Sequence, residues 1–600
     1  MNGRLPTAHG VHAAKNTRLP TVLVFLSVPR HVYLFIEVGG VMSFLRACGP
    51  LFLFAILGAA QPSITNVVNN ASGIVQALPN GGIAQGAIFL ITGSGLGPSP
   101  IVIDPNPFHN TSVGGTSVSV TVGTTTVSAL MYYSSDGQLS AVLPSSAPTG
   151  TGTVTVTYNG NTSSTAPITV VQNNPGIFTA SQNGQGVADV TYPDGSVVSP
   201  YKATGCGGPN TFCGAANPGD IVTLWATGLG PVNGNDATGA GLSSPINVSV
   251  TIWLGGVQIT PSYNGRSGYI GLDQINFTVP SGVPTGCAVP IALQVGSLVS
   301  NYALMAVANG SRSCTPSNPA LTPSVVQSIL SSTGSVSYGQ IALRRQIASA
   351  SNGLQYVDVG QGSFAQIALS PQIQPLLLSY IDTEPMGACL VSNTLTPTNS
   401  LPTLSTNGLD AGRITVTGPA GIQVMREQLG FGQATVYSAT FSQSGTYFSG
   451  GNYTVSGAGG TNGGLGNVSS FAAQFTITQT PSWTSDEQAS LYKSGVSRAN
   501  GATINWNGSS TNYYVEIDGS AATDSTYTAG ATFSCLVNSN AGTFTIPPSV
   551  LLAFPASSNS GVAGEIDFRP TINPVPITAS GLNLGSVTMN YLTSLFPAFI

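Results

Sequence analysis

The residues in this sequence best suited to catalysis are four closely spaced pairs of acids: Asp382 with Glu384, Asp486 with Glu487, Glu516 with Asp518, and Glu565 with Asp567. Hydrolysis of a glycosidic bond needs only two carboxyl groups, so each pair meets its first requirement. The last two pairs are spaced two residues apart in apparent strands, which directs both side chains to one face of a sheet. Solvated charge that suppresses pairing between sheet edges gives the same pattern. We favour that second interpretation and predict no catalytic residue.

Oxygen-rich side chains also raise the question of calcium. The same acids, and the loop residues Asn233, Asn235 and Asp236, carry the hard oxygen atoms that Ca²⁺ prefers. None of them falls in a twelve-residue calcium-loop pattern. We therefore predict no metal and no cofactor, and calcium stays an alternative that no specific motif supports.

Histidine is scarce in the part of the chain that we expect to be exported. His9, His12 and His31 precede the predicted signal peptide, which leaves His109 in an Asn-Pro-Phe-His-Asn sequence typical of a loop. A Ser-His-Asp or Cys-His arrangement would depend on this one residue, which we interpret as a surface histidine. Zinc sites that need two or more histidines are excluded.

Aromatic side chains offer a non-catalytic alternative, the stacking of sugar rings. Trp506, Tyr513 and Tyr514 could form one platform, and Tyr132 with Tyr133 another. Burial of the tryptophans in sandwich cores is the interpretation we favour. The cations Lys202, Arg266 and Arg312 are isolated in the sequence and form no patch.

The first 60 residues resemble a targeting region. From Met42, the basic Arg46 precedes an apolar stretch over residues 51–57 and the small residues Gly58-Ala59-Ala60, the order of a secretory signal peptide. We predict that residues 42–60 are cleaved, that residues 1–41 are an over-extended gene start, and that the protein is secreted or held at the cell surface. The alternative is a membrane anchor, but so short an apolar stretch favours cleavage. We predict no transmembrane helix in the mature chain.

Six cysteines remain once Cys48 is removed with that segment. An even number in an exported chain favours three disulfides, with free thiols as the alternative. We favour Cys206 with Cys213 across a Gly-Pro-Asn turn, Cys287 with Cys314 around the last strands of the second repeat, and Cys389 with Cys535 in the C-terminal half.

The composition indicates sheets. Charged residues make up only 6% of the 600 residues and hydrophobic residues 42%, and the formal net charge is −5. Such a chain suits β-sheets whose solvent faces carry hydroxyl and amide groups, and it lacks the basic surface of a nucleic-acid-binding protein.

An internal duplication organises the first half. An apolar run ends in Gly93-Ser94-Gly95-Leu96-Gly97-Pro98, and a second run ends in Ala226-Thr227-Gly228-Leu229-Gly230-Pro231. Further on, Gln138-Leu139 corresponds to Gln274-Ile275, and each is followed by a proline at the same spacing. Short β-rich runs separated by turn signals recur through both copies, as in a sandwich.

These patterns predict an all-β fold of tandem immunoglobulin-like β-sandwiches in series. The expected divisions are sandwich repeats at 61–172 and 173–314, a linker or transition region at 315–385, a third β-domain at 386–480, and a fourth at 481–600. In the last of these we expect strands near residues 503–506, 513–517, 532–536, 542–546 and 550–554.

The motifs of the first half also resemble a known family. Asn70-Ala71-Ser72-Gly73, the two glycine-rich turns, Asn174–Phe178, Asp194-Gly195-Ser196 and Gly271–Asn276 follow one another as in the Solibacter-type C-terminal domain of exported soil-bacterial proteins. The resemblance covers about residues 63–314, and the repeats are also similar to immunoglobulin-like TIG sandwiches. The first repeat departs from the pattern at Asp136–Ser140. The family implies export and tandem sandwiches, and it supplies no reaction.

Two functions follow from these observations. The first is an exported non-enzymatic protein with a structural, adhesion or ligand-binding role at or outside the cell surface. The second is a protein that binds or hydrolyses extracellular polysaccharide through aromatic platforms and a carboxylate pair. We favour the first, with an extracellular ligand or a cell-surface component, polysaccharide among them, as its partner.

Overall fold

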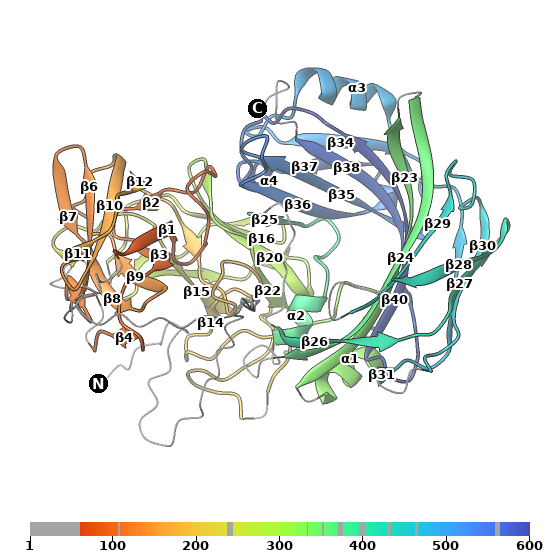
Figure 1. Cartoon of the computed structure of the whole chain (residues 1–600), viewed down its shortest axis with the longest axis horizontal. Helices are drawn as coiled ribbons and strands as arrows, with labels where there is room; N and C mark the ends of the chain where they lie inside the picture. The colour runs from red at the N-terminus through yellow and green to blue at the C-terminus, as the bar shows by residue number, and fades with distance from the viewer. Residues whose placement is uncertain are drawn as a thin grey trace, which may run out of the picture. The chain divides into compact units, whose positions relative to one another are not determined.

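The structure is a computed structural model of the chain, shown in Figure 1. It describes residues 61–105, 108–203, 205–236, 244–332, 334–350, 353–369, 376–394, 403–428, 434–461, 466–557 and 564–600. The predicted signal peptide and gene-start segment therefore lie outside the described residues. Residues 61–600 form one compact unit. Within the described residues, no helix has both the length and the apolar character needed to cross a membrane.

Residues 61–171 fold as a β-sandwich. One sheet has the order β1-β3-β9-β8-β4 and the other β2-β12-β10-β6-β5, with β7 and β11 at the side. Buried and half-buried residues alternate strictly along β6, as the Val-Ser-Val-Thr-Val pattern predicts. The strands are β1 (Ser63–Asn69), β2 (Ile83–Ala84), β3 (Ile88–Ser94), β4 (Val102–Ile103), β5 (Ser112–Val113), β6 (Thr116–Val122), β7 (Thr125–Ser128), β8 (Leu130–Ser134), β9 (Gln138–Val142), β10 (Gly150–Tyr158), β11 (Asn161–Thr162) and β12 (Ala166–Val171).

Residues 176–307 form a second sandwich. Its sheets have the orders β13-β15-β19-β18 and β17-β16-β20-β21, with β14 beside β15 and β22 beside β20. The strands are β13 (Gly176–Ile177), β14 (Val190–Thr191), β15 (Ile221–Thr227), β16 (Thr251–Leu254), β17 (Val257–Ile259), β18 (Tyr263–Arg266), β19 (Asp273–Thr278), β20 (Gly286–Val295), β21 (Leu298–Val299) and β22 (Ala303–Val307).

The duplicated motif has the same role in both sandwiches. β3 pairs antiparallel with β9, and β15 pairs antiparallel with β19 in the same way. The leucine of each glycine-rich turn, Leu96 and Leu229, is fully buried in the core of its sandwich. The repeated sequence is therefore a strand followed by a turn that inserts one core side chain.

The C-terminal half is built on one large sheet. Fifteen described strands join it, in the order β25-β36-β35-β38-β40-β23-β24-β29-β28-β27-β30-β32, with β26, β31 and β39 off this path. Its strands are β23 (Ser335–Ala350), β24 (Gly353–Leu369), β25 (Cys389–Ser392), β26 (Thr403–Asp410), β27 (Ile414–Gly418), β28 (Gly421–Gln428), β29 (Thr435–Ser442), β30 (Gly451–Gly457), β31 (Gly466–Asn467), β32 (Phe471–Ile477), β35 (Tyr513–Ala522), β36 (Gly530–Asn538), β38 (Glu565–Ile572), β39 (Val575–Pro576) and β40 (Leu584–Leu595).

A small sheet and short helices complete this half. The order of the small sheet is β33-β34-β37, and it shares a core with β35, β36 and β38. The elements are α1 (Pro323–Ser331), α2 (Leu377–Ile381), β33 (Ser482–Trp483), α3 (Ser485–Ser494), β34 (Ala502–Asn507), η3 (Ser539–Ala541), β37 (Thr543–Ile546) and α4 (Pro548–Leu551). A strand expected at 550–554 is instead the end of α4 and the turn after it, because Pro548 stands at the first helical positions, where its fixed φ favours a helix.

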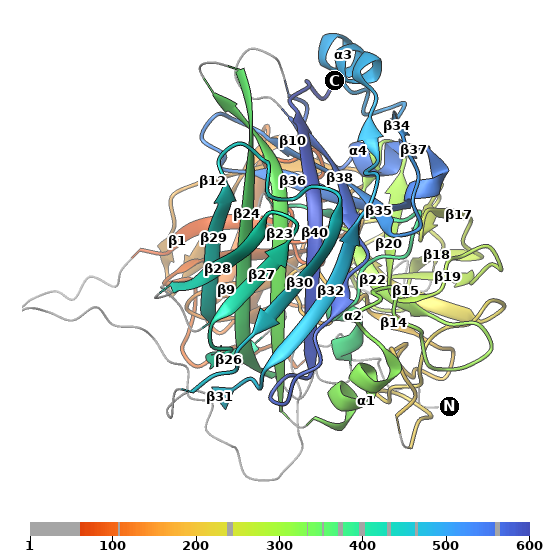
Figure 2. The same cartoon turned by 90° about the vertical axis from the view of Figure 1, so that its right-hand side faces the viewer.

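The large sheet curls back on itself. Side chains of β23, β24 and β40, among them Ile341, Phe364 and Met589, share one core with Val416 of β27, Tyr453 of β30 and further residues of β32. In Figure 2, the strands from β29 to β32 lie in front of β23, β24 and β40. The two sides of the curl therefore bury one another's apolar faces.

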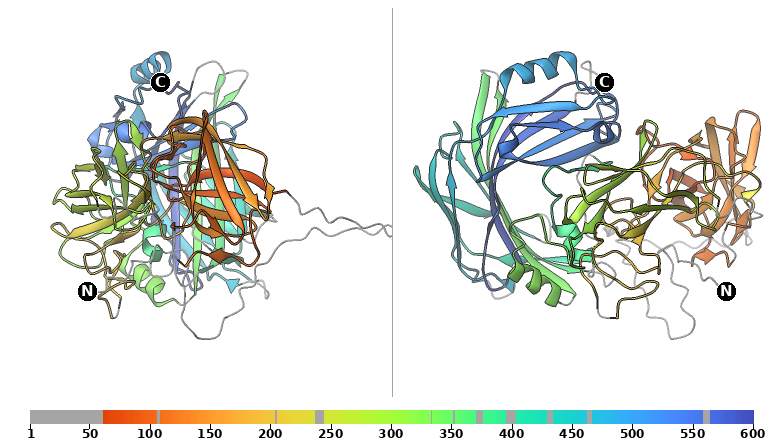
Figure 3. Two further views of the ribbon diagram at one scale, coloured as in Figure 1. Left: turned by 90° about the vertical axis from the view of Figure 1, so that its left-hand side faces the viewer. Right: turned by 180° about the vertical axis from the view of Figure 1, so that it is seen from behind.

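This sheet differs from the division expected from sequence. The segment 315–385 contains β23 and β24, the longest described strands, and the sheet also holds strands from both 386–480 and 481–600 (Figure 3). The physical reason is that β40 pairs in parallel with β23, from Tyr338 beside Leu584 to Gln346 beside Leu592. The all-β class itself is confirmed.

Candidate functional site

Two of the predicted carboxylate pairs meet on neighbouring strands. β35 pairs antiparallel with β38 so that Asp518 lies opposite Asp567, Glu516 opposite Arg569, and Ser520 opposite Glu565. Because side chains alternate along a strand, these residues share one face, while Val515, Ile517 and Phe568 point into the core behind it. The sheet thus gathers Glu516, Asp518, Glu565 and Asp567 around one arginine.

Arg569 is the centre of this group. Its Nη1 lies 2.8 Å from Oδ2 of Asp518 and 3.6 Å from Oε1 of Glu516, and its Nη2 donates a hydrogen bond of 3.0 Å to Oδ2 of Asp567. Ser594 of β40 donates to the other oxygen of Asp567 at 2.5 Å. The side chains of Arg569, Glu516, Asp518 and Asp567 are only 12–24% exposed. These acids are therefore not the solvated edge charges that the sequence suggested.

The group lines a cavity of about 430 Å³. We call it the acidic cavity. Its wall comes from β25, β36, β35 and β38 of the large sheet and from two residues of the second sandwich, Gln185 and Tyr302. Leu390 and Val391 add an apolar side. The volume falls within the usual range of small-molecule sites.

Burial governs the ionisation of the cavity acids. Desolvation raises the pKa of Glu516, of Asp518 and of Glu565, and the charge of a neighbouring acid raises it further in each case. For Arg569, burial alone would lower the pKa, but the charges of Asp518, Glu516 and Asp567 raise it above its ordinary value. Arg344 of β23 also interacts with these charges. Burial lowers its pKa, and the positive charge of Arg569 lowers it further.

Glu384 is a fifth carboxyl group beside the cavity. Burial raises its pKa to about 7, and the charge of Glu516 adds to the shift. Its side chain hydrogen-bonds to Ser534, a cavity-lining residue that lies opposite Asp518. Its other oxygen, Oε1, is buried without a hydrogen-bond partner. Glu384 therefore interacts with Ser534 and Glu516 as well as with Asp382, its neighbour in the sequence.

Of the remaining predicted acids, Asp382 and Glu487 have structural contacts. Asp382 accepts hydrogen bonds from the backbone N–H groups of Cys287, Ser317 and Asn318. Glu487 accepts from both the backbone and the side-chain nitrogen of Asn505, and Asp486 is exposed in the first turn of α3.

The candidate ligands Asp236 and His109 do not line the acidic cavity. Asp236 uses both carboxylate oxygens on Ser145 of the first sandwich, and His109 is exposed in a loop. Among the described residues, no three His, Cys, Asp or Glu side chains are placed so that they could hold a metal ion.

Trp506 is buried in a core, the interpretation favoured from the sequence, and the alternative of an aromatic platform on β34 and β35 is not formed. Trp506 packs against Phe568 and is 5% exposed, and its Nε1 donates to the carbonyl of Ser539 at 2.8 Å. Tyr513 is likewise buried, in the core formed by the curl of the large sheet. Tyr514 lies on the cavity side of its strand, and Tyr132 and Tyr133 are half-buried in the first sandwich. The alternation of β35 separates Tyr513 from Tyr514 and removes the platform.

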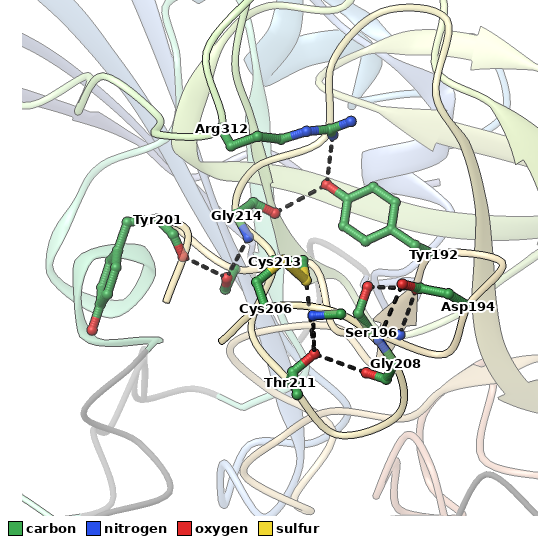
Figure 4. The surroundings of a disulfide bond; sticks show 12 residues. Tyr192, Asp194, Ser196, Tyr201, Cys206, Gly208, Thr211, Cys213, Gly214 and Arg312 are labelled. Carbon is green, nitrogen blue, oxygen red and sulfur yellow. Dashed lines mark hydrogen bonds between the residues drawn. A yellow bond between two sulfur atoms is a disulfide. The ribbon is translucent and has the colours of Figure 1, made fainter. Parts of the chain in front are cut away.

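The six cysteines form three disulfides, Cys206–Cys213, Cys287–Cys314 and Cys389–Cys535, the pairs that the sequence analysis favoured. Figure 4 shows the first, whose loop is held by hydrogen bonds from the backbone of Ser196 and Gly208 to Asp194. Beside it, Arg312 donates to the Tyr192 hydroxyl at 2.9 Å. These contacts describe an internally braced loop.

The most deeply buried cation among the described residues, Arg266, is isolated in the sequence. Arg266 is 1% exposed and pairs with the fully buried Asp273. Its Nη2 donates to the carbonyl oxygens of Gly86 at 2.9 Å and Gly230 at 3.0 Å, so it joins the first sandwich to the glycine-rich turn of the second. The signal that could have found it is Asp273, the acid within the Gly-Leu-Asp-Gln-Ile-Asn motif.

Comparison with known proteins identifies one domain. The model of the IPT/TIG domain family matches residues 74–171, so the first sandwich is an immunoglobulin-like TIG domain. The match spans less than half of the chain and assigns the domain only. The comparisons do not support the resemblance to the Solibacter-type family. No curated protein matches the chain.

Several solved structures are also similar in part. The chain is 12% identical to SGBP-B from the mixed-linkage glucan utilization locus of Bacteroides ovatus, over 78% of this chain and 93% of that chain, with a TM-score of 0.12. It is 14% identical to domains 5-6 of the S-layer protein SbsC, over 42% and 100%, with a TM-score of 0.15. A segment of titin is 11% identical over 68% and 96%, with a TM-score of 0.12. At these scores the likenesses carry no argument about function.

Proposed function

We propose that this chain is an exported, non-enzymatic protein that binds an extracellular ligand in the acidic cavity. The single observation that carries this proposal is the convergence of four acids and Arg569 in a cavity of about 430 Å³. By contrast, the ion pair of Arg266 with Asp273 is completely buried, with exposures of 1% and 0%. The three disulfides support export, because such bonds persist in oxidising compartments.

The tandem sandwiches then have a structural role. Arg266, Asp236 and Ser145 join them through buried polar contacts, so the two domains hold a fixed arrangement. The second sandwich contributes Gln185 and Tyr302 to the cavity wall. Scaffold and binding site are therefore parts of one unit. The proposal requires no cofactor.

Binding rather than hydrolysis is favoured by the position of Arg569. The same guanidinium contacts Asp518 and Asp567, the two acids that face one another across β35 and β38. A general acid and a nucleophile need different environments, so a shared cation disfavours those roles. A glycoside-hydrolysing protein stays the alternative.

A ligand panel tests the proposal. The chain from Gln61 to Ile600 is mixed with oligosaccharides, amino sugars, polyamines and amino acids, and unfolding midpoints are compared with those of Glu565→Gln and of the control Asp486→Asn. We expect at least one ligand to raise the midpoint of the wild type and of Asp486→Asn but not of Glu565→Gln. If a ligand raises the unfolding midpoint of all three proteins equally, it does not bind in the acidic cavity. Release of reducing ends from any oligosaccharide, lost in Glu516→Gln, would overturn the non-enzymatic assignment.

A further inference from the structure

We propose that residues 382–388, which join α2 to β25, form a pH-sensitive strap between the second sandwich and the large sheet. A proton on Glu384 keeps this strap closed, and loss of that proton in mildly alkaline solution loosens it. No ligand is needed for this behaviour, so it stands apart from the binding proposed above. Two features of the strap carry it, the unequal hydrogen bonding of its two acids and the charges around them.

The first residue of the strap fixes it to the second sandwich. Oδ2 of Asp382 accepts hydrogen bonds from the backbone N–H groups of Cys287 at 3.1 Å and Ser317 at 3.0 Å, and Oδ1 accepts one from Asn318 at 2.8 Å. Cys287 belongs to β20. Burial raises the pKa of Asp382, but these three hydrogen bonds oppose the rise because they favour the charged form. This attachment therefore suits an ionised carboxylate.

The last two residues of the strap fix it to the large sheet. The N–H of Gly387 donates to the carbonyl of Leu536 at 2.6 Å, and the N–H of Leu536 donates to the carbonyl of Ala388 at 3.2 Å. Leu536 lies on β36, so the strap continues into the pairing of β25 with β36. Glu384 stands between the two attachments in the sequence and is buried. A change in its charge therefore acts on the segment that connects them.

Glu384 has fewer hydrogen-bond donors than Asp382. Its side chain hydrogen-bonds to its own backbone N–H and to the hydroxyl of Ser534 on β36, while its Oε1 is buried without a partner. The same hydroxyl hydrogen-bonds to Asp518 on β35. A serine hydroxyl has one hydrogen atom, so it cannot donate to two carboxylates at once. At least one of these two acids must carry a proton for both bonds to form.

The proton is better placed on Glu384 than on Asp518. Burial raises the pKa of both acids. Asp518, however, lies 2.8 Å from Nη1 of Arg569, whereas none of the ion pairs among the described residues includes Glu384. The other nearby cation, Arg344, interacts with the acids of β35 and β38. A neighbouring cation favours the ionised form of an acid, so Glu384, which has none, is the acid that keeps the proton.

The remaining groups around Glu384 also oppose its ionisation. Burial raises its pKa to about 7, and the charges of Glu516 and Asp382 add to the rise. Tyr514 of β35 stays neutral at this pH, because burial raises its pKa as well. The strands that the strap contacts, β20, β25 and β36, contain no charged residue. An ionised Glu384 would therefore be buried beside like charges with no cation to neutralise it, which is unfavourable.

The direction of the pH effect follows from the two states of the strap. In the closed strap the pKa of Glu384 is about 7, and in a loosened strap, where water reaches the carboxyl group, it returns toward its ordinary 4.5. The stabilisation of the closed strap is therefore complete below pH 4.5 and is lost as the pH rises through 7. Between pH 6 and pH 8.5, the equilibrium should shift about tenfold toward the loosened strap.

Hydrogen exchange measured by mass spectrometry tests the strap without any ligand. Exchange of chain 61–600 is followed at pH 6 and pH 8.5, and each rate is divided by the intrinsic exchange rate at that pH. We expect the protection of peptides that cover the strap to fall about tenfold in the wild type and in the control Asp486→Asn, but not in Glu384→Gln, which is uncharged at both pH values. Peptides from β10 of the first sandwich should respond to pH equally in all three proteins.

A second variant keeps the test decisive if Glu384→Gln folds poorly. Glu516→Gln retains Glu384 but removes one of the charges that raise its pKa, so the midpoint of the pH-dependent loss of protection should move to lower pH. A midpoint that is unchanged or higher would overturn the proposal. So would an equal fall in protection in wild type and Glu384→Gln, or strap protection in the wild type that does not change with pH.

Discussion

Arg266 and Asp273 form a completely buried ion pair at the junction between the two sandwiches, with exposures of 1% and 0%. Both side chains of the pair also form hydrogen bonds with the backbone. Arg266 donates to the carbonyls of Gly86 and Gly230, and Asp273 accepts from the backbone N–H of Leu229 at 2.8 Å. Burial raises the pKa of Asp273 while the charge of Arg266 opposes that rise, so the carboxylate depends on its partner.

Removing one partner of the Arg266–Asp273 ion pair should lower the free energy of unfolding. Arg266→Met leaves the Asp273 carboxylate buried without its cation, and we expect a loss of about 3–5 kcal/mol in the free energy of unfolding. Urea denaturation of chain 61–600 measures it. Arg312→Met is the matched control, because its pair with Asp220 is 38% and 21% exposed, and it should lose about 1 kcal/mol or less. Equal losses in the two variants would contradict the assigned role of the junction.

The pH dependence of stability should report Glu384. Its pKa is raised to about 7 in the folded protein, so folding favours its protonated form. The contribution is fully present below the unfolded pKa of about 4.5 and is lost as the pH rises through 7, with a total change of about 3 kcal/mol. Urea midpoints of wild type and Glu384→Gln, compared at pH 4 and pH 8, should therefore differ more at pH 8, in favour of the variant. A difference independent of pH would show that Glu384 is not buried as described.

The disulfides should contribute unequally to the free energy of unfolding. Cys389–Cys535 closes a loop with a sequence separation of 146 residues, and Cys206–Cys213 one of 7. The chain-entropy model gives about 5 kcal/mol for the long loop and about 2 kcal/mol for the short one. Replacing each pair by alanine and measuring urea denaturation tests this order. The reverse order would indicate that Cys389–Cys535 is not needed to hold β25 on β36.

Trp506 should act on stability and not on binding. Because its indole is buried against Phe568, Trp506→Ala should lose about 3–5 kcal/mol of unfolding free energy. Whatever ligand the panel identifies should bind the folded fraction of this variant as it binds wild type. Lost binding with unchanged stability would instead restore the platform interpretation.

Local patterns predicted local features of this chain. The apolar runs before the glycine-rich turns predicted strands there, and spacing favoured the cysteine pairs that the structure contains. The spacing of Glu516 with Asp518 and of Glu565 with Asp567 correctly placed each pair on one face. That the two strands are neighbours, and that Arg569 stands between the pairs, depends on sheet order, which no local pattern encodes.

The same limit explains the C-terminal half. β23 and β24 carry many small and polar residues, so their strand pattern is weak, and their partners β40 and β29 come much later in the sequence. Arg266 was missed for a similar reason. An isolated arginine has no periodicity, and its buried role appears only when Gly86 and Gly230 are brought to it.

The pairing of β40 with β23 has a consequence for biogenesis. Among the described strands of this sheet, β40 is synthesised after all the others, so the β23–β24 hairpin has one unpaired edge until residues 584–595 have been made. Each partly made molecule therefore presents a template on which a second copy could pair. A chain that stops before Leu584 would expose that edge permanently, and this half of the protein would be prone to aggregate even though both sandwiches were complete.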